Sequence, residues 1–158
     1  MALLPALQKL LTDSQVGYTH HVHPLAFTAR EVAAAEHIPP REVAKTIVYF
    51  GDHGYGMAVL PGDFVVDLNE LRAALDLTRA RLATERELAG LFPQCELGAM
   101  PPVGVMFGMP VYVDSSLTRN QTIAFNGGTH RDVVILRYAD FEKLVQPRVM
   151  QFARFVTR

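Results

Sequence analysis

A strand, a tight turn and a return strand near the middle of the chain limit the fold more than any other feature. Residues 45–50 are rich in β-branched and aromatic side chains, which is a strong strand signal. Gly-Asp-His-Gly at residues 51–54 is typical of a hairpin turn, and residues 55–61 form the apolar return strand. We expect this hairpin to lie in the middle of a β-sheet, with Lys45 at the mouth of a buried strand.

Short helices are predicted between the strands. Leucines recur at helical spacing over residues 3–11 and predict an amphipathic helix whose leucine face either closes the core or contacts a partner. Capping boxes, in which a threonine is followed three residues later by a glutamate, predict helices that begin at Thr28 and Thr84. Two more helices are expected over residues 67–75 and 138–145.

The pattern of strands and helices predicts the fold class. Further strands are expected over residues 18–23, 79–83, 109–114, 122–125 and 133–136. Strands that cluster into hairpins between short helices, without regular βαβ units, predict an α+β fold with a mixed, partly closed sheet. The length of 158 residues is typical of one domain, so we expect a single domain over residues 1–158. The tail after Pro147 has no predicted structure.

Composition narrows the classes of function. Lys and Arg number 15 against 16 Asp and Glu, so the chain is not a general polyanion binder, and we expect no DNA partner. The single cysteine, Cys95, excludes an internal disulfide, which fits a reducing cytosol. There is no charged leader and no apolar run of about 20 residues, so we expect a cytoplasmic protein without a membrane partner.

A second hairpin is predicted in the last third of the chain. The sequence Asn-Gly-Gly-Thr-His-Arg-Asp occupies residues 126–132, between the two apolar strands. Its Asn-Gly pair favours positive φ and predicts a tight turn. Gly127 and Gly128 lack a Cβ, so another group can approach their backbone, and polar side chains crowd the strand end directly after them. This crowding is the first indication of a site.

Three histidines on the strand over residues 18–23 raise the alternative of a metal-dependent hydrolase. His21 and His23 fall on one face of this strand and His20 on the other, and no carboxylate or thiol stands at ligand spacing. A polar strand edge is the other interpretation. We expect neither a metal nor another cofactor.

The common catalytic motifs are missing from the sequence, which has no nucleophile elbow, P-loop, dinucleotide fingerprint or HExxH. With Lys45, a Gly/Pro loop at residues 98–104 and the Gly-Gly-Thr-His turn, the chain resembles the YbaK/ProX family of aminoacyl-tRNA deacylases. These are free-standing editing proteins related to the domain inserted in bacterial prolyl-tRNA synthetases. The matching segments are His23-Pro24 with Phe27-Thr28, residues 42–46, 60–63, Ala83-Thr84 with Glu87-Leu88, 98–104, 111–114 and 125–130.

The resemblance implies a fold, a substrate and a reaction. The fold is the family's mixed, barrel-like sheet flanked by helices, the substrate is the 3′ end of a mischarged tRNA, and the reaction is hydrolysis of the aminoacyl ester. Lys45 is the implied catalytic residue, in a positioning and electrostatic role, and its ammonium alternatively holds the phosphate of the terminal adenosine. The residues predicted to bind substrate are Tyr18, Phe27, Thr46, Gly98, Pro102, Gly104, Asp114, Asn126, Gly127, Gly128, Thr129, His130 and Asp132.

Some of these roles have alternatives. His130 is the one candidate for a general base, and otherwise it forms a wall of the pocket. Asp114 either caps Ser115 and Ser116 or faces the pocket. We expect the two glycines of the turn to leave room that Thr129 and His130 partly refill, which keeps alanine, cysteine, serine, threonine and proline as candidate amino acids.

The expected partner is the acceptor end of an aminoacylated tRNA. Because the net charge is near zero, tRNA affinity is expected to be modest, with selectivity borrowed from an aminoacyl-tRNA synthetase or an elongation factor. A function of another class is a non-catalytic module that binds aminoacyl-tRNA or a free amino acid and assists a synthetase.

Overall fold

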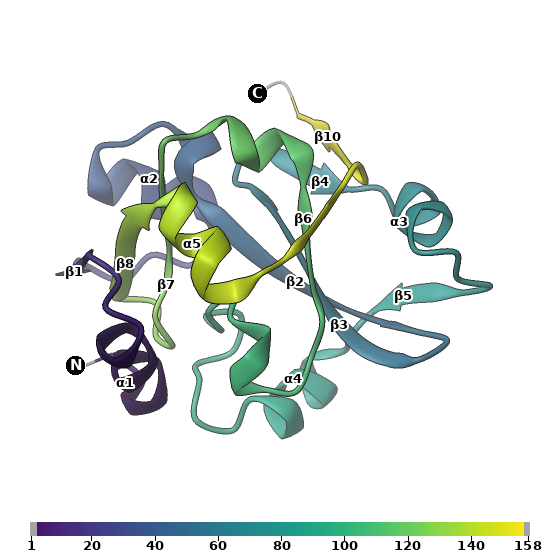
Figure 1. Ribbon diagram of the computed structural model, residues 1–158, viewed down its shortest axis with the longest axis horizontal. Helices are drawn as coiled ribbons and strands as arrows, with labels where there is room; N and C mark the ends of the chain where they lie inside the picture. The colour runs from purple at the N-terminus through teal and green to yellow at the C-terminus, as the bar shows by residue number, and fades with distance from the viewer. Residues whose placement is uncertain (1–2, 157–158) are drawn as a thin grey trace.

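A five-stranded mixed sheet forms the centre of the computed structural model, which describes residues 3–156 (Figure 1). Its strands, in spatial order, are β5 (Ala80–Leu82), β2 (Ala44–Gly51), β3 (Gly54–Pro61), β6 (Val111–Asp114) and β9 (Arg148–Met150). The β2-β3 hairpin lies inside this sheet, as predicted. The pairs β3-β6 and β6-β9 are parallel, which makes the sheet mixed.

Two smaller sheets complete the β-structure of the described residues. One has the order β1-β8-β7, and the other pairs β10 with β4. An isolated parallel bridge between Val43 and Ala124 links β7 to the start of β2, so the sheets wrap around the core without closing into a barrel. The predicted α+β class with a mixed, partly closed sheet is confirmed. The bounds are β1 (Tyr18–Val22), β4 (Phe64–Val66), β7 (Thr122–Asn126), β8 (Asp132–Arg137) and β10 (Ala153–Phe155).

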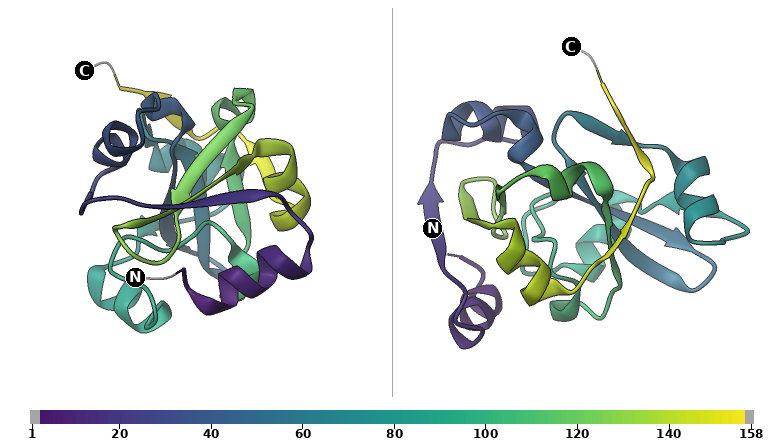
Figure 2. Two further views of the ribbon diagram at one scale, coloured as in Figure 1. Left: turned by 90° about the vertical axis from the view of Figure 1, so that its left-hand side faces the viewer. Right: turned by 45° about the horizontal axis from the view of Figure 1, so that its top comes forward.

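Short helices surround these sheets (Figure 2). They are α1 (Pro5–Asp13), α2 (Ala29–Glu36), α3 (Leu68–Ala74), α4 (Glu85–Leu91) and α5 (Tyr138–Val145). Both predicted capping boxes are present, because the Thr28 and Thr84 hydroxyls accept from backbone N–H groups three residues on and the glutamates there bond back. Asp67 is the N-cap residue of α3, and its side chain accepts from the N–H groups of Asn69 and Glu70.

The leucine face of α1 closes the main core. Leu7 and Leu11 are fully buried, and Leu3 and Leu4 are nearly so. They pack in one cluster with residues of β2, β3, β6, β7 and β8, among them Phe125. Of the two roles predicted for this face, the structure therefore supports core packing.

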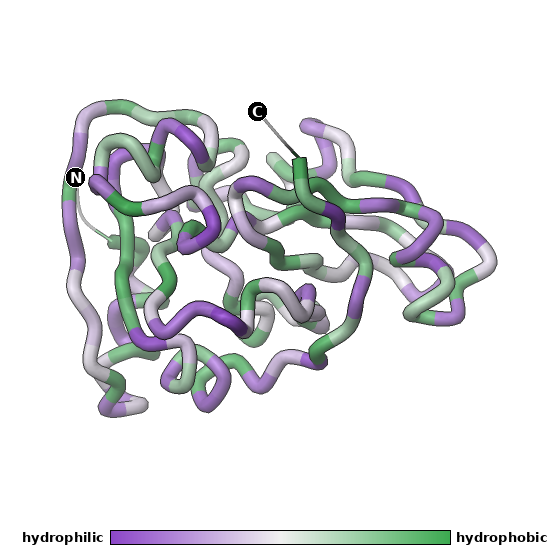
Figure 3. Tube along the Cα trace, turned by 90° about the horizontal axis from the view of Figure 1, so that it is seen from above, coloured by the Kyte–Doolittle hydropathy of each residue, from purple (hydrophilic) through white to green (hydrophobic). Residues whose placement is uncertain are grey.

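Three of the four three-residue strands were not predicted from local signals. β4, β9 and β10 have three residues each and contain mostly exposed or half-exposed side chains. They exist because they pair with distant segments, β10 with β4 and β9 with β6. No helix within residues 3–156 is long and apolar enough to cross a membrane, and Figure 3 shows hydrophobic and hydrophilic residues intermingled along the trace.

Candidate active site

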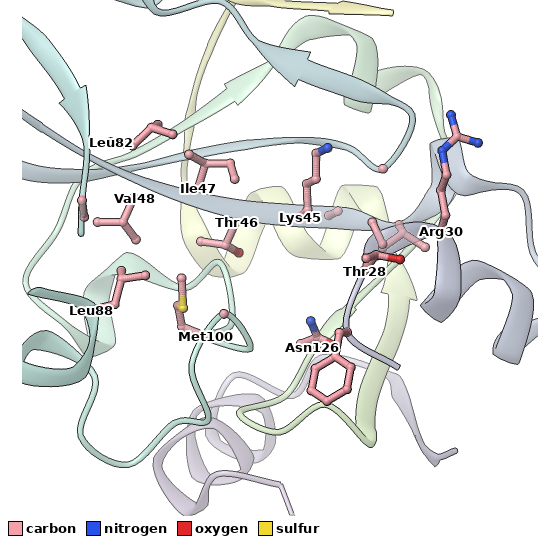
Figure 4. A pocket seen from close by; sticks show the side chains of 17 residues that line it. Thr28, Arg30, Lys45, Thr46, Ile47, Val48, Leu82, Leu88, Met100 and Asn126 are labelled. Atoms are coloured by element: carbon pink, nitrogen blue, oxygen red, sulfur yellow. The ribbon is translucent and has the colours of Figure 1, made fainter. Parts of the chain in front are cut away.

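A cavity of about 510 Å³ lies along one edge of strand β2 (Figure 4). Strand β5 pairs with β2 only at residues 49–51, and the Val43–Ala124 bridge brings β7 to the other end of β2. Between these two points, no strand in the described part of the chain is paired with residues 44–47 on this edge. The cavity fills this gap in the sheet.

The lining comes from six parts of the chain, of which five precede β7. These five are residues 27–30 at the start of α2, residues 43–48, Gly62, residues around α4, and the loop that carries Gly98 and Met100. Asn126 at the end of β7 completes the lining, and its Oδ1 is buried without a hydrogen-bond partner among residues 3–156. Five predicted site residues line the cavity: Phe27, Lys45, Thr46, Gly98 and Asn126.

The Lys45 side chain is half-buried, and its ammonium is not paired with any carboxylate of residues 3–156. Burial lowers the pKa of Lys45, the positive charge of Arg30 lowers it further, and the carboxylate of Asp63 acts in the opposite direction. Figure 4 shows the side chains of Lys45 and Arg30 on the same side of β2. An unpaired ammonium in a partly dry cavity can interact strongly with an anionic or developing anionic group.

The Gly98 loop forms the opposite wall of the cavity. Gly98 has a φ of 84°, a conformation that favours glycine. The N–H groups of Gly98 and Met100 donate no hydrogen bond within residues 3–156. The loop is anchored on both sides, because Ala99 N donates to Glu96 O at 3.0 Å and Gly128 N donates to Ala99 O at 3.0 Å. The loop therefore offers backbone donors on a fixed frame.

His130 lies directly behind this wall. Its Nε2–H donates to the carbonyl of Leu97 at 2.6 Å, and its Nδ1 is buried without a partner in the described chain. The ring of Phe27 lies 4.9 Å away, centroid to centroid, and a Cβ on Gly98 would be 3.7 Å from the His130 Cε1 atom. His130 thus supports two residues of the lining, Phe27 and Gly98, and does not itself line the cavity.

Comparison with known proteins gives the family. The family model of the aminoacyl-tRNA editing domain matches residues 23–144. The chain belongs to this family. The matched segment contains all of the cavity-lining residues, so the cavity is the candidate active site of an editing domain.

Relatives and solved structures agree with this assignment. The multifunctional Ser/Thr-tRNA deacylase ProXp-y of Escherichia coli is 33% identical over 105 residues, which are 66% of this chain and 62% of that protein. A proline–tRNA ligase of Fervidobacterium nodosum is 32% identical over the same share of this chain but only 18% of its own length. The match thus spans less than two thirds of the deacylase. A crystal structure of a candidate trans-editing enzyme for prolyl-tRNA synthetase shares the fold, with a TM-score of 0.83 at 23% identity over 97% of this chain and 99% of that chain.

The Gly127-Gly128 loop of the editing domain differs from the tight turn that we predicted. Positive φ occurs at Gly128, with 108°, and not at Asn126 or Gly127, and residues 127–131 separate the paired strands. The reason is tertiary, since the loop is bonded to other segments: Leu4 N donates to Gly127 O at 3.2 Å, and Glu96 N donates to Gly128 O at 2.8 Å. A Cβ on Gly127 would collide with Leu3, so the room that this glycine leaves is taken by the N-terminal segment.

Thr129 and Asp132 stabilise this loop from within. The Thr129 hydroxyl donates to Asp132 Oδ2 at 2.6 Å and accepts from the N–H groups of Arg131 and Asp132. Asp132 is fully buried and also bonds His20 Nε2 at 2.6 Å. Burial raises the pKa of Asp132, but the bonds from Thr129 and His20 lower it more, so the pKa lies below its usual value. Neither Thr129 nor Asp132 lines the cavity, and their contact with a substrate stays a prediction.

The remaining predicted site residues lie outside the cavity lining. Asp114 is buried, and its carboxylate accepts from Ser116 and from the N–H groups of Phe152 and Ala153, each of these two at 2.8 Å. Tyr18 is half-buried against the main core. Pro102 and Gly104 lie further along the chain than Gly98 and Met100 and are buried. A role of these four residues in substrate binding stays a prediction.

The three histidines of β1 and the loop after it have separate partners. His20 bonds Asp132, His21 Nδ1 lies 2.8 Å from Glu36, and His23 Nδ1–H donates to the carbonyl of Pro24 at 2.7 Å. Among residues 3–156, no three His, Cys, Asp or Glu residues gather in a way that could hold a metal. β1 is an edge strand, in line with the interpretation of these residues as a polar strand edge.

Arg30, Leu88 and Met100 also line the cavity and were not predicted from the sequence. Each had an indirect signal. Arg30 is the second residue of the helix that Thr28 caps, Leu88 follows the glutamate of the second capping box, and Met100 lies in the predicted Gly/Pro loop. None of these signals indicates that the residue faces a cavity, because that depends on how distant segments pack.

Proposed function

We propose that this protein hydrolyses the ester bond of mischarged aminoacyl-tRNA. The observation that carries the proposal is the cavity of this editing domain, which is lined by a lysine without an ion pair in residues 3–156 and by a glycine loop whose Gly98 and Met100 N–H groups have no partner there. The names of two relatives, a Ser/Thr-tRNA deacylase and a proline–tRNA ligase, support the same class of substrate.

The chemistry suits these groups. Negative charge develops on the ester carbonyl as water attacks it, and a cation and N–H donors fixed in a partly dry cavity stabilise this charge without reorganisation. Lys45 supplies the cation, and the Gly98 loop supplies donors on a frame that His130 supports. No carboxylate of residues 3–156 lines the cavity, so in this proposal a hydroxyl of the terminal ribose helps to activate the water, and His130 positions the wall.

The expected amino acid is small. Val48, Leu88 and Met100 form an apolar part of the lining, next to the side chain of Thr46 (Figure 4). Alanine, serine and threonine are the amino acids that we favour. Discrimination among them is expected to be weak, because one methylene in such a pocket changes the free energy of binding by only ~1–3 kcal/mol. The acceptor end of the tRNA, in the cytoplasm, is the proposed partner, with a synthetase or elongation factor as the source of further selectivity.

A panel of mischarged tRNAs tests the function. The full-length protein is incubated with tRNAs that carry labelled alanine, serine, threonine, cysteine or proline, and the remaining ester is measured over time. The proposal expects loss of at least one ester faster than in buffer. A non-catalytic module would instead protect the bound ester, so protection or no change for every tRNA would contradict hydrolysis.

Arg30 is expected to bind the phosphate next to the terminal adenosine. It lines the cavity on the side of Lys45, and its only hydrogen bond within residues 3–156 is a long one, from Nη2 to Val156 O at 3.5 Å. Arg30→Ala should raise the KM for mischarged tRNA by about tenfold, because a charge-assisted bond to phosphate is lost. Hydrolysis of 3′-alanyl adenosine, which has no phosphate, should not change.

The matched control for this prediction is Arg148→Ala, which removes an exposed arginine on edge strand β9, outside the cavity lining. Steady-state kinetics of both variants with both substrates give the comparison. Equal losses of Arg30→Ala on the tRNA and on the adenosine ester would show that Arg30 does not act through a phosphate.

A further inference from the structure

The β2-β3 hairpin determines the edge toward which each peptide group of β2 points. The turn leaves Gly51 opposite Gly54, and the register continues without interruption to Ala44 opposite Pro61. In a two-residue hairpin the closing pair exchanges both hydrogen bonds, and the N–H and C=O groups of successive residues point to alternate edges. Odd-numbered residues of β2 therefore bond β3, and even-numbered residues face the other edge.

A contact at that other edge agrees with this alternation. The C=O of Val48 accepts from Ala83 N at 2.9 Å, so the peptide groups of residue 48 face β5. Two residues earlier, Thr46 faces the same edge, but the pairing of β5 with β2 covers only residues 49–51. At the start of β2, the bridge to β7 is formed by Val43, one residue before the strand, and not by Thr46. Within residues 3–156, Thr46 thus presents an N–H and a C=O to the cavity with no strand paired to them.

We propose that the peptide edge of Thr46 binds the amino-acid part of the substrate. An α-aminoacyl ester carries one amino group and one carbonyl, the same pair of groups as a single residue of a strand. It can therefore occupy the missing position between β5 and β7 as one antiparallel residue would. The α-ammonium donates to Thr46 C=O, and Thr46 N–H donates to the ester carbonyl. This inference rests on the function proposed above.

The position of Thr46 N–H connects this contact to Lys45. The N–H belongs to the peptide group between Lys45 and Thr46, so a carbonyl bonded to it lies next to the backbone of Lys45. A donor at this place stabilises the charge that develops on the carbonyl oxygen during attack. The contact also does not depend on the amino-acid side chain, which suits an enzyme that acts on more than one small amino acid.

The same pairing predicts which enantiomer binds. Side chains of directly opposed residues in an antiparallel pair lie on the same face of the sheet. An L-aminoacyl group opposite Thr46 therefore directs its side chain to the face of the Thr46 side chain, on which Leu88 and Met100 lie in Figure 4. A D-aminoacyl group would direct its side chain to the opposite face, against Ile47 and Lys45.

Nuclear magnetic resonance of the full-length protein tests the contact. The probe is 3′-deoxy-3′-(L-alanylamido)adenosine, in which an amide replaces the reactive ester. The chemical shift of the Gly98 amide shows when the probe has saturated the protein. At saturation, exchange of the Thr46 amide with solvent should slow by about tenfold or more, because its N–H gains a hydrogen bond. The amide of Ile47, which already bonds β3, should not change. An unchanged exchange rate at Thr46 would overturn the proposal.

Two related probes test the pairing itself. The D-alanyl isomer and the N-acetylated L-alanyl derivative should leave the Thr46 amide unchanged at the same concentration, since the first reverses the side chain and the second blocks the amino group. Equal protection by either compound would overturn the proposed pairing.

A backbone substitution provides a kinetic test. Incorporation of the α-hydroxy analogue of threonine at residue 46 replaces the peptide bond after Lys45 with an ester and so removes the Thr46 N–H without changing a side chain. It should lower kcat/KM for the mischarged tRNA by about 10²-fold, as for loss of one donor to a developing oxyanion. The same substitution at Leu25, an exposed residue outside the cavity lining, is the control. A melting temperature like that of the control shows that the fold is retained. A kcat/KM equal to that of the control would overturn the contact.

The failures of this inference and of the proposed function can be distinguished. If no mischarged tRNA is hydrolysed but the L-alanyl probe protects the Thr46 amide, the proposed function fails and the binding mode stands. If a tRNA is hydrolysed and the Thr46 amide is unaffected, the function stands and this inference fails.

Discussion

Replacement of Lys45 by alanine is expected to reduce deacylation of mischarged tRNA by about 10²- to 10³-fold, the effect of losing one group that stabilises a developing oxyanion. The fold should be retained, because Lys45 is half-buried and forms no ion pair with residues 3–156. Single-turnover rates give the loss of activity, and thermal unfolding followed by circular dichroism checks the fold.

Lys143→Ala is the matched control for this variant, because Lys143 is an exposed residue of α5 outside the cavity lining. Lys45→Met, which keeps the apolar stem without the charge, separates packing from electrostatics and should be as inactive as Lys45→Ala. Full activity of Lys45→Ala would refute the mechanism proposed above.

The second large effect concerns stability. Asp114→Ala is expected to lower the free energy of unfolding by about 3–5 kcal/mol, because it leaves the buried N–H groups of Phe152 and Ala153 without an acceptor and breaks the bonds to Ser116. The carboxylate joins the end of β6 to the segment between β9 and β10. Urea denaturation followed by circular dichroism measures the change.

Asp67→Ala is the control for Asp114→Ala. Asp67 also accepts from backbone N–H groups, as the cap of α3, but it is half-exposed, so its loss should cost only about 1 kcal/mol. A loss for Asp114→Ala no larger than that of Asp67→Ala would show that Asp114 acts only as a helix cap. The structure shows that the predicted cap, from Asp114 to Ser116, is one of several bonds that the Asp114 carboxylate accepts, the others coming from Phe152 and Ala153.

Elements whose signals are local were predicted well. The capping boxes at Thr28 and Thr84 are contacts between residues three positions apart, and both helices begin where predicted. The β2-β3 hairpin is closed by a two-residue turn, and this turn sets the register of the two strands. Its register is therefore also a local property. The strands that were missed, β4, β9 and β10, carry little signal of their own and depend on their partners, since β4 and β10 pair with each other and β9 pairs with β6.

The candidate site was only partly predictable. Lys45 and Gly98 were found through the family resemblance, and both line the cavity. The loop after Asn126 was expected to leave space for a substrate, yet a Cβ on Gly127 would meet Leu3, because the N-terminal segment packs there. Such packing joins residues more than 120 positions apart, and no local pattern in the sequence reports it.

The sequence by itself determined the longer strands, the helix starts and the family, because spacing, capping and turn chemistry act over a few residues, and family motifs are read in order along the chain. Only the tertiary structure decided where a substrate can bind. The cavity exists because the pairing of β5 with β2 stops at residue 49 while β7 bridges only to Val43, just before β2, and both limits are set by contacts between distant segments. The unpaired peptide edge of Thr46 between them follows from these contacts, and the residue type at position 46 does not reveal it.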